Sequence, residues 1–180
     1  MSTRKKAWLA ASLVLTLGPV ALAAETPKLG KPITEADIAA WDIAAMPDGK
    51  GLPPGSGTAV QGAPIYAQKC VACHGENGKG GVAPGAGALA GGGPLTAGID
   101  TPKTIGNFYG YATTVFDFTR RSMPFNMPLS LTDNEVYALT AYILALNKII
   151  GENDVMDAKT LPQVKMPNRD GFIIRFPDRI

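Results

Sequence analysis

The chain has 180 residues, 46% of them hydrophobic, which fits one modest domain with a core and does not suggest a second full domain. Its formal net charge is +2, but three of the 17 basic residues lie in the first six positions, so residues 24–180 carry 14 basic against 15 acidic side chains. This near-neutral balance, without a clustered basic face, excludes nucleic-acid binding.

The N-terminus has the pattern of a secretory signal peptide. Three basic residues at 4–6 precede an apolar run over 7–17, and small residues at 21–23 provide a cleavage site. The apolar run is shorter than the roughly 20 residues that span a bilayer, so we expect cleavage after Ala23 rather than a stable membrane span. Residues 1–23 are therefore predicted to be a signal peptide that exports the chain to the periplasm.

The next segment, residues 24–58, is predicted to be an N-terminal extension that ends in a Gly/Pro-rich linker. Thr34 and the acidic residues that follow it have the pattern of a helix N-cap and first turn, which predicts a short helix over 38–45. Glycine and proline dominate residues 47–62, and neither suits a helix or a strand, so we expect a surface loop there. The core domain is expected to begin at about residue 59.

The core domain is predicted to be all-α. A helix over 62–70 leads into a Gly/Ala-rich loop over 75–93, which has so few side chains of its own that it must wrap around something large and apolar. A further helix is expected over 111–121. A capping box that starts at Thr132 opens a strong amphipathic helix that ends near Asn147. No period-2 alternation of any length and no βαβ pattern are present.

Residues 70–74 form a Cys-x-x-Cys-His motif, which is the attachment pattern of c-type haem. Two thiols one helical turn apart reach the two vinyl groups, and the adjacent histidine places its imidazole on the iron. A zinc site would need four ligands, a thioredoxin-like pair would need a βαβ unit, and a disulfide would leave the histidine unexplained. We therefore expect one haem c, held by Cys70 and Cys73 with His74 as a metal ligand.

The sixth iron ligand must be methionine, lysine or absent, because His74 is the only histidine and no cysteine is spare. Four methionines precede proline in residues 24–180, so this pair alone decides nothing: Met46, Met123, Met127 and Met166. The segment 121–128 lies just ahead of the last helix, where a loop can cross the haem face, and it holds two of them. We favour Met123 because the loop then has more residues in which to return from the iron to the last helix. Met127 is the alternative ligand, and its other expected role is packing against the porphyrin ring.

Two further contacts of the haem are predicted. The carbonyl of Pro84 is expected to accept a hydrogen bond from the ring nitrogen of His74, with Pro94 as the weaker candidate. Arg120 is a candidate partner for the haem propionates or for another protein, whereas paired basic residues near a helix end are also typical of a solvated face that favours the helix dipole.

Histidine and methionine together fill both axial positions of the iron and raise its reduction potential, which suits outer-sphere electron transfer and not substrate activation. We therefore expect an electron carrier, not an enzyme, with no catalytic residues. A haem enzyme or gas sensor with an open iron position is the alternative from a different class.

The segment CVACHG, the loop GKGGVAPGAGALAG, the Met-Pro segment and the helix LTDNEVYALTAYILALN together resemble the class I cytochrome c family over residues 59–147. This resemblance implies a small helical domain around a His/Met haem, in which the first and last helices cross. TIGNFYGYATTVFDFTRRSMPF and DVMDAKTLPQVKMPNRDGF are also similar to the cytochrome subunits of bacterial sulfane and sulfite dehydrogenases. In those subunits the methionine of the RxMPF segment, here Met123, is the ligand. Sulfane dehydrogenase subunits often have a second haem domain, whereas this chain has a single Cys-x-x-Cys-His.

The narrower resemblance implies a periplasmic subunit of the sulfur-oxidation system. It would take single electrons from a molybdenum-containing sulfite or sulfane dehydrogenase and pass them to a downstream cytochrome. A cytochrome partner of a quinoprotein alcohol dehydrogenase is the alternative carrier. Residues 148–180 form a C-terminal extension, and like residues 24–58 it is expected to pack on the domain or to dock a catalytic subunit.

Overall fold

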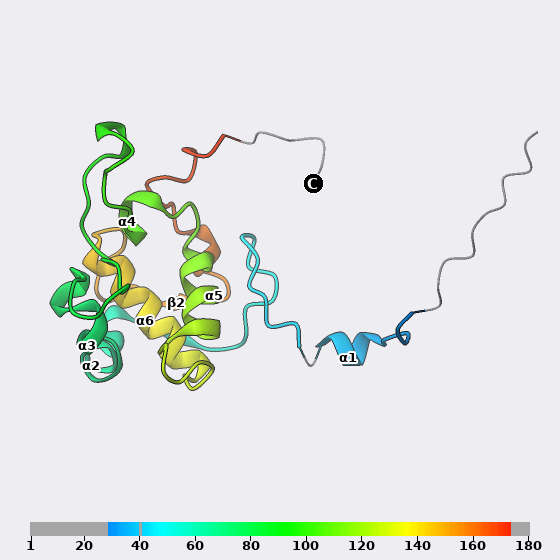
Figure 1. Cartoon of the computed structure of the whole chain (residues 1–180). Helices are drawn as coiled ribbons and strands as arrows, with labels where there is room; N and C mark the ends of the chain where they lie inside the picture. Colours follow the sequence, from blue (N-terminus) through cyan, green and yellow to red (C-terminus); the bar gives the residue numbers. More distant parts are fainter. Residues whose placement is uncertain (1–28, 40, 174–180) are drawn as a thin grey trace, which may run out of the picture. The chain divides into compact units, whose positions relative to one another are not determined.

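The computed structural model describes residues 29–39 and 41–173 (Figure 1). The predicted signal peptide, residues 1–23, lies outside the described residues. Residues 34–39 and 41–173 belong to one compact unit. This unit contains every helix and strand given below.

Among the described residues, the regular secondary structure of this unit is helical apart from one pair of two-residue strands, so the predicted all-α class is confirmed. The α-helices are α1 (Glu35–Ala39), α2 (Ala59–Lys69), α3 (Val71–His74), α4 (Ile105–Phe108), α5 (Ala112–Ser122) and α6 (Asp133–Leu146). Three short 3-10 helices are η1 (Glu76–Gly78), η2 (Leu95–Ala97) and η3 (Leu161–Gln163). Strands β1 (Ser56–Gly57) and β2 (Met156–Asp157) pair antiparallel, with Ser56 opposite Asp157.

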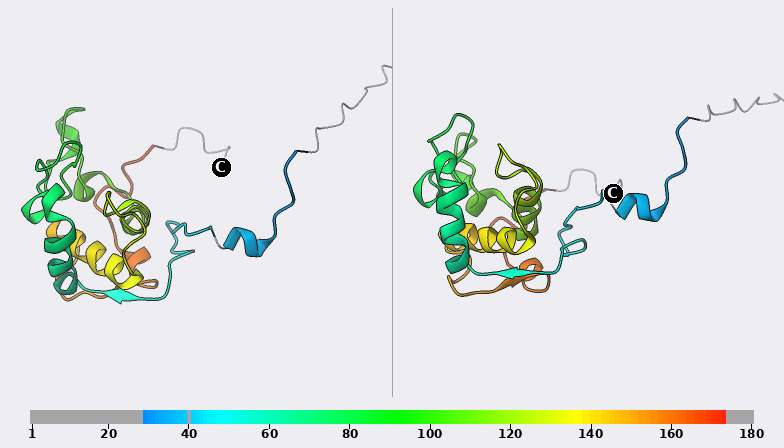
Figure 2. Two further views of the ribbon diagram at one scale, coloured as in Figure 1. Left: turned by 60° about the horizontal axis from the view of Figure 1, so that its bottom comes forward. Right: turned by 90° about the horizontal axis from the view of Figure 1, so that it is seen from below.

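Helix α6 lies at the centre of the core. In Figures 1 and 2, α2 and α3 lie on one side of it and α5 lies on the other. Because α6 has neighbours on two sides, its buried residues cover more than one face of the helix, and they include Val136, Tyr137, Leu139 and Leu144. The ring of Phe116 on α5 packs against Tyr137 with centroids 4.5 Å apart. The last helix therefore joins the two halves of the domain.

Helix α2 crosses α6 at a glycine. A Cβ atom at Gly62 would overlap the backbone of Ala138, so only glycine lets the two helices approach this closely. One turn further along, the rings of Tyr66 and Tyr142 lie 5.1 Å apart between centroids. The first and last helices of the domain thus cross, as the family resemblance implied.

Capping boxes begin three of the helices. Thr58 accepts a hydrogen bond from the backbone of Gln61 at the start of α2, Thr132 does the same with Glu135 at α6, and Thr104 repeats the pattern at α4. The box at Thr132 was predicted, and it sets the start of the most strongly predicted helix. The expected helices over 62–70 and 111–121 are α2 and α5 with slightly different ends.

The helix predicted over 38–45 is wrong, because α1 ends at Ala39. The backbone N–H of Ala45 donates to Oδ1 of Asp117 on α5 at 2.8 Å, and the carbonyl of Ile43 accepts from Arg120 at 3.3 Å. Asp117 takes the N–H of Ala45, which in a helix would donate to the carbonyl of Trp41, and both contacts hold this part of the extension against α5.

The C-terminal extension forms part of the core. Strand β2 pairs with β1, and the side chains of Leu161 and Met166 are among the most completely buried in the described chain, with 0% and 1% exposed. The extension therefore packs on the domain, which is one of the two roles expected for it. None of the described helices is long and apolar enough to cross a membrane.

Candidate functional site

The two cysteines lie at the junction of α2 and α3. Helix α2 ends at Lys69, Cys70 has a non-helical backbone, and the chain restarts as α3, which carries Cys73 and His74. Both thiols are free. Burial raises the pKa of the Cys70 thiol to about 11.

The imidazole of His74 is oriented by a backbone carbonyl. Its Nδ1 lies 3.1 Å from the oxygen of Gly87, and because a carbonyl can only accept, Nδ1 carries the hydrogen. The other ring nitrogen, Nε2, then has its lone pair available for iron. The predicted acceptor Pro84 is therefore wrong, as is Pro94, and the carbonyl belongs to a residue three positions beyond Pro84.

The path of the glycine-rich loop explains why Gly87 is the acceptor. The N–H of Gly80 donates to the carbonyl of His74 at 2.7 Å, and the N–H of Ala83 donates to that of Cys73 at 3.3 Å. These bonds fold residues 80–83 back over the motif, so that the chain passes the imidazole only after a further turn at Pro84. Gly75, with φ of +71°, permits the reversal directly after the histidine.

Tyr66 supports the same turn from α2. Its hydroxyl donates to the carbonyl of Gly75 at 2.9 Å, and its side chain is buried. Burial raises the pKa of Tyr66 to about 12, so the hydroxyl keeps its proton and remains a donor at neutral pH. Tyr66 falls within the helix predicted over 62–70, but the sequence contains no signal for this contact, because the partner is a backbone atom.

Met123 lies where α5 ends. It is the C-terminal cap of that helix, its backbone is extended, and its side chain is half-buried. Met127 is 60% exposed, Met46 is 49% exposed and Met166 is buried in the core. Because α3 and α5 lie on either side of α6, the histidine and Met123 come from opposite sides of the central helix (Figures 1 and 2). Ligation by Met123 stays a prediction.

Arg120 contacts two other parts of the chain. Its Nε lies 3.2 Å from Oδ1 of Asp133, and its guanidinium donates to the carbonyl of Ile43. The neighbouring Arg121 pairs with Asp117 one turn earlier in the same helix. The guanidinium of Arg120 therefore joins α5 to the start of α6 and to the N-terminal extension, and its contact with the haem propionates stays a prediction.

The side chains at this site fit haem c. Cys70 and Cys73 are free and one helical turn apart, His74 has a fixed ring with an available Nε2, and Met123 offers a thioether. Within the described residues, no cluster of three or more His, Cys, Asp or Glu side chains could hold a bare metal ion. The donor set therefore suits an iron porphyrin attached through two thioethers and not a zinc ion.

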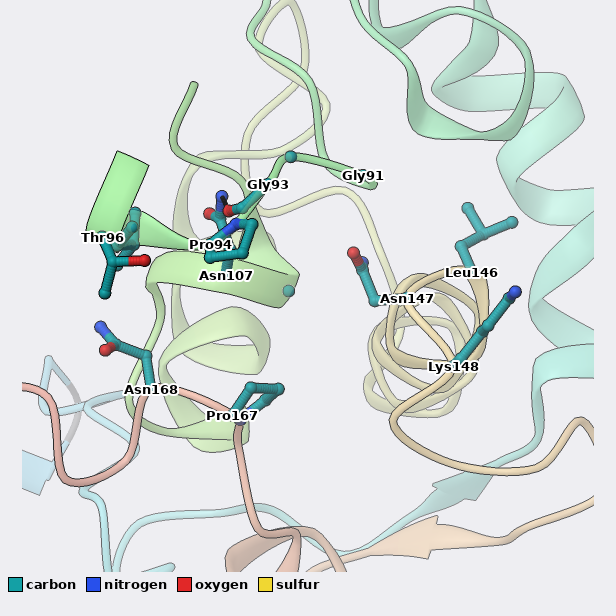
Figure 3. Close-up of a pocket in the computed structure, with 13 residues that line it drawn as sticks. Gly91, Gly93, Pro94, Thr96, Asn107, Leu146, Asn147, Lys148, Pro167 and Asn168 are labelled. Carbon is teal, nitrogen blue, oxygen red and sulfur yellow. Dashed lines mark hydrogen bonds between the residues drawn. The ribbon is translucent and has the colours of Figure 1, made fainter. Parts of the chain in front are cut away.

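A separate pocket of about 540 Å³ lies between α4 and the end of α6 (Figure 3). Its lining includes the loop 91–96, Asn107 on α4, and Asn147 and Lys148 after α6. Neither the cysteines nor His74 nor Met123 lines it. The pocket thus lies outside the set of haem-binding side chains, although its wall includes the loop that follows Gly87.

Comparisons with known proteins show what this chain is similar to. The family described as Cytochrome c matches residues 59–147. Among solved structures, the chain is similar to one chain of the crystal structure of the sulfane dehydrogenase SoxCD from Paracoccus pantotrophus. The two share 38% sequence identity with a TM-score of 0.73, over 86% of this chain and 73% of that chain. No curated protein matches the sequence.

Proposed function

Because this chain belongs to the cytochrome c family, has its class I fold and binds haem c covalently, we propose that it carries single electrons in the periplasm from a molybdenum-containing sulfite or sulfane dehydrogenase to a further cytochrome. The observation that carries the proposal is the donor set: two free thiols one turn apart beside an imidazole whose Nδ1 is already bonded to Gly87. That arrangement leaves one nitrogen for one iron.

When bound, haem c supplies a one-electron couple between ferric and ferrous iron. Cys70 and Cys73 would hold the porphyrin, and His74 would bind the iron. Met123 as a second iron ligand would leave no site for a substrate or for oxygen, and the chain would then need no catalytic base. The work of these residues is to hold the ring in one orientation and to keep water from the iron.

The similarity to SoxCD supports a dehydrogenase as the electron donor. The family match over 59–147 covers about half of the chain, whereas the similarity to the SoxCD chain covers 86% of it. The extensions outside the cytochrome domain are thus largely shared with a protein that occurs in a sulfane dehydrogenase. A generic soluble carrier would share only the central domain.

The experiment is haem reduction through a partner. The chain, expressed with its signal peptide, is tested for co-purification with a molybdenum subunit from the same source, and haem reduction is followed after adding sulfite or thiosulfate. We expect reduction only when the subunit is present and a mature N-terminus at Ala24 in the periplasmic fraction. If neither sulfite nor thiosulfate reduces the haem through any endogenous partner, the proposal is contradicted. Haem reduction by an alcohol through a quinoprotein would identify the alternative carrier role.

A further inference from the structure

The loop after the haem motif is held by side chains at alternate carbonyls. The oxygens of residues 87, 89, 91 and 93 accept hydrogen bonds from His74 Nδ1 (3.1 Å), Asn147 Nδ2 (3.0 Å), Thr104 Oγ1 (2.7 Å) and Asn107 Nδ2 (2.9 Å), respectively. The imidazole is thus the first member of a series whose other members come from α4 and from the end of α6. The position of Gly87 depends on how its neighbours in the series are held.

On the C-terminal side of Gly87, the nearest residue held by hydrogen bonds is Leu89. Its N–H donates to the carbonyl of Gly78 at 2.7 Å, directly after the haem-binding turn. Its own carbonyl accepts from Asn147 and also from the N–H of Ile105, at 3.2 Å. The backbone of Leu89 therefore joins the motif, α4 and α6, two residues away from the carbonyl that orients the histidine.

The side chain of Asn147 is itself fixed in one orientation. Its Nδ2 donates to the carbonyl of Ile143 on α6 at 2.9 Å as well as to that of Leu89. Its Oδ1 occupies the space that a Cβ atom at Gly106 of α4 would fill, so a larger residue there would displace the amide. Figure 3 shows Asn147 and Asn107 on either side of the pocket. The side-chain amide of Asn147 is thus held between α4 and the end of α6.

We propose that Asn147 is a positioning residue for the axial histidine: by holding the carbonyl of Leu89, it keeps the carbonyl of Gly87 on Nδ1 of His74. This inference rests on His74 being the iron ligand of the proposed carrier. A carbonyl that accepts from Nδ1 makes the imidazole a stronger electron donor, which stabilises ferric iron and lowers the reduction potential. The end of the last helix thereby tunes the haem without contacting it.

The test compares Asn147→Ala with Asn107→Ala in the haem-loaded protein. Both substitutions remove a side-chain amide that holds a carbonyl of the same loop, but the carbonyl held by Asn107 lies six residues from Gly87 instead of two. At the ambient potential where the wild type is half reduced, we expect the ferrous-to-ferric ratio of Asn147→Ala to rise about threefold. The ratio of Asn107→Ala should stay near one.

Two further measurements keep the test decisive. Exchange of the Nδ1 hydrogen of His74 with solvent, followed by NMR in the ferrous protein, should be about tenfold faster in Asn147→Ala than in the wild type. Gly106→Ala retains the Asn147 amide but displaces it, so this variant should also raise the ferrous-to-ferric ratio. If Asn147→Ala does not fold, Gly106→Ala replaces it in the test. Thermal unfolding of each variant separates a general loss of stability from a change at the haem.

An unchanged potential and exchange rate in both Asn147→Ala and Gly106→Ala would overturn the inference, as would an equal shift in Asn107→Ala. These outcomes are distinct from failure of the proposed function. If the wild-type haem were high-spin with an open iron, the carrier role would fail, whereas a low-spin wild type with an unaffected Asn147→Ala variant contradicts only the positioning role.

Discussion

At the scale of single residues, the turn after His74 is held by a buried hydroxyl. Tyr66 donates to the carbonyl of Gly75, and its ring packs on Tyr142 of α6. A buried carbonyl that loses its donor cannot recover the bond from water without local opening. The hydroxyl therefore stabilises the same backbone that places the iron ligand.

Tyr66→Phe should lower the free energy of unfolding by about 1–2 kcal/mol, because it removes the donor and leaves the ring in place. Urea unfolding of the haem-loaded protein measures the change. Tyr142→Phe is the matched control, since it keeps the ring contact and does not touch the bond to Gly75, and it should have the smaller effect. An equal loss in both variants would show that the bond to Gly75 contributes nothing.

Residue types were predictable from the sequence where a motif fixes them, and backbone partners were not. Cys70, Cys73 and His74 follow from a spacing that the porphyrin imposes, and the structure places them on one turn. The acceptor for the imidazole was expected at Pro84, but it is Gly87, because the bonds of Gly80 and Ala83 determine where the loop passes the ring. Such a path depends on backbone contacts that residue spacing does not encode.

At the scale of elements, an ion pair joins the end of α2 to the start of α6. Nζ of Lys69 lies 2.6 Å from Oε1 of Glu135, and Glu135 also completes the capping box with Thr132. The bond to Lys69, with the backbone bond to Thr132, lowers the pKa of Glu135 below its ordinary value of 4.5. The ion pair stabilises the α2–α6 contact only while the carboxylate is charged.

Glu135→Gln should lower the free energy of unfolding by about 0.5 kcal/mol at neutral pH, because glutamine keeps the cap but loses the charge. A carboxyl group whose pKa is lower in the folded state stabilises the fold above its unfolded pKa and loses that contribution as the pH falls. The difference between the variant and the wild type should therefore be present above pH 4.5 and shrink below it. Urea unfolding at several pH values measures this, and a difference that does not vary with pH would contradict it.

Elements with a periodic pattern and a cap were predictable from the sequence, and short ones were not. The capping box at Thr132 and the apolar stripe after it gave α6 nearly its observed bounds. The helix expected over 38–45 fails because Asp117, more than 70 residues away, takes the N–H of Ala45 that the helix would use. Helix α4 is one turn long, so it offered no periodicity to detect.

At the scale of the whole molecule, the folded domain includes residues that follow α6 as well as the segment from the haem motif to that helix. Leu161 and Met166 are buried in the same core as α5 and α6, and β2 pairs with β1 ahead of α2. The sequence could indicate a proline-containing tail but not its place, because isolated apolar residues show no period. The C-terminal extension is therefore a structural part of the domain.

Leu161→Ala should lower the free energy of unfolding by about 3 kcal/mol, because it leaves a cavity under α6 and α5. Val155→Ala, six residues earlier in the same extension, is the control: its side chain is 48% exposed, and it should cost less than about 1 kcal/mol. Thermal or urea unfolding measures the loss of stability in both variants. Similar losses would contradict this account of the tail.

The central claim is that His74 and a methionine fill both axial positions of the iron, so that the chain carries electrons and does not activate a substrate. The most direct measurement is the absorption spectrum of the ferric protein together with carbon monoxide binding by the ferrous form, in the wild type, Met123→Ala and Met127→Ala. We predict a far-red charge-transfer band and no carbon monoxide binding in the wild type and in Met127→Ala, with both properties reversed in Met123→Ala. A high-spin wild type that binds carbon monoxide readily would contradict the carrier role, and loss of the band in Met127→Ala alone would assign the ligand to Met127.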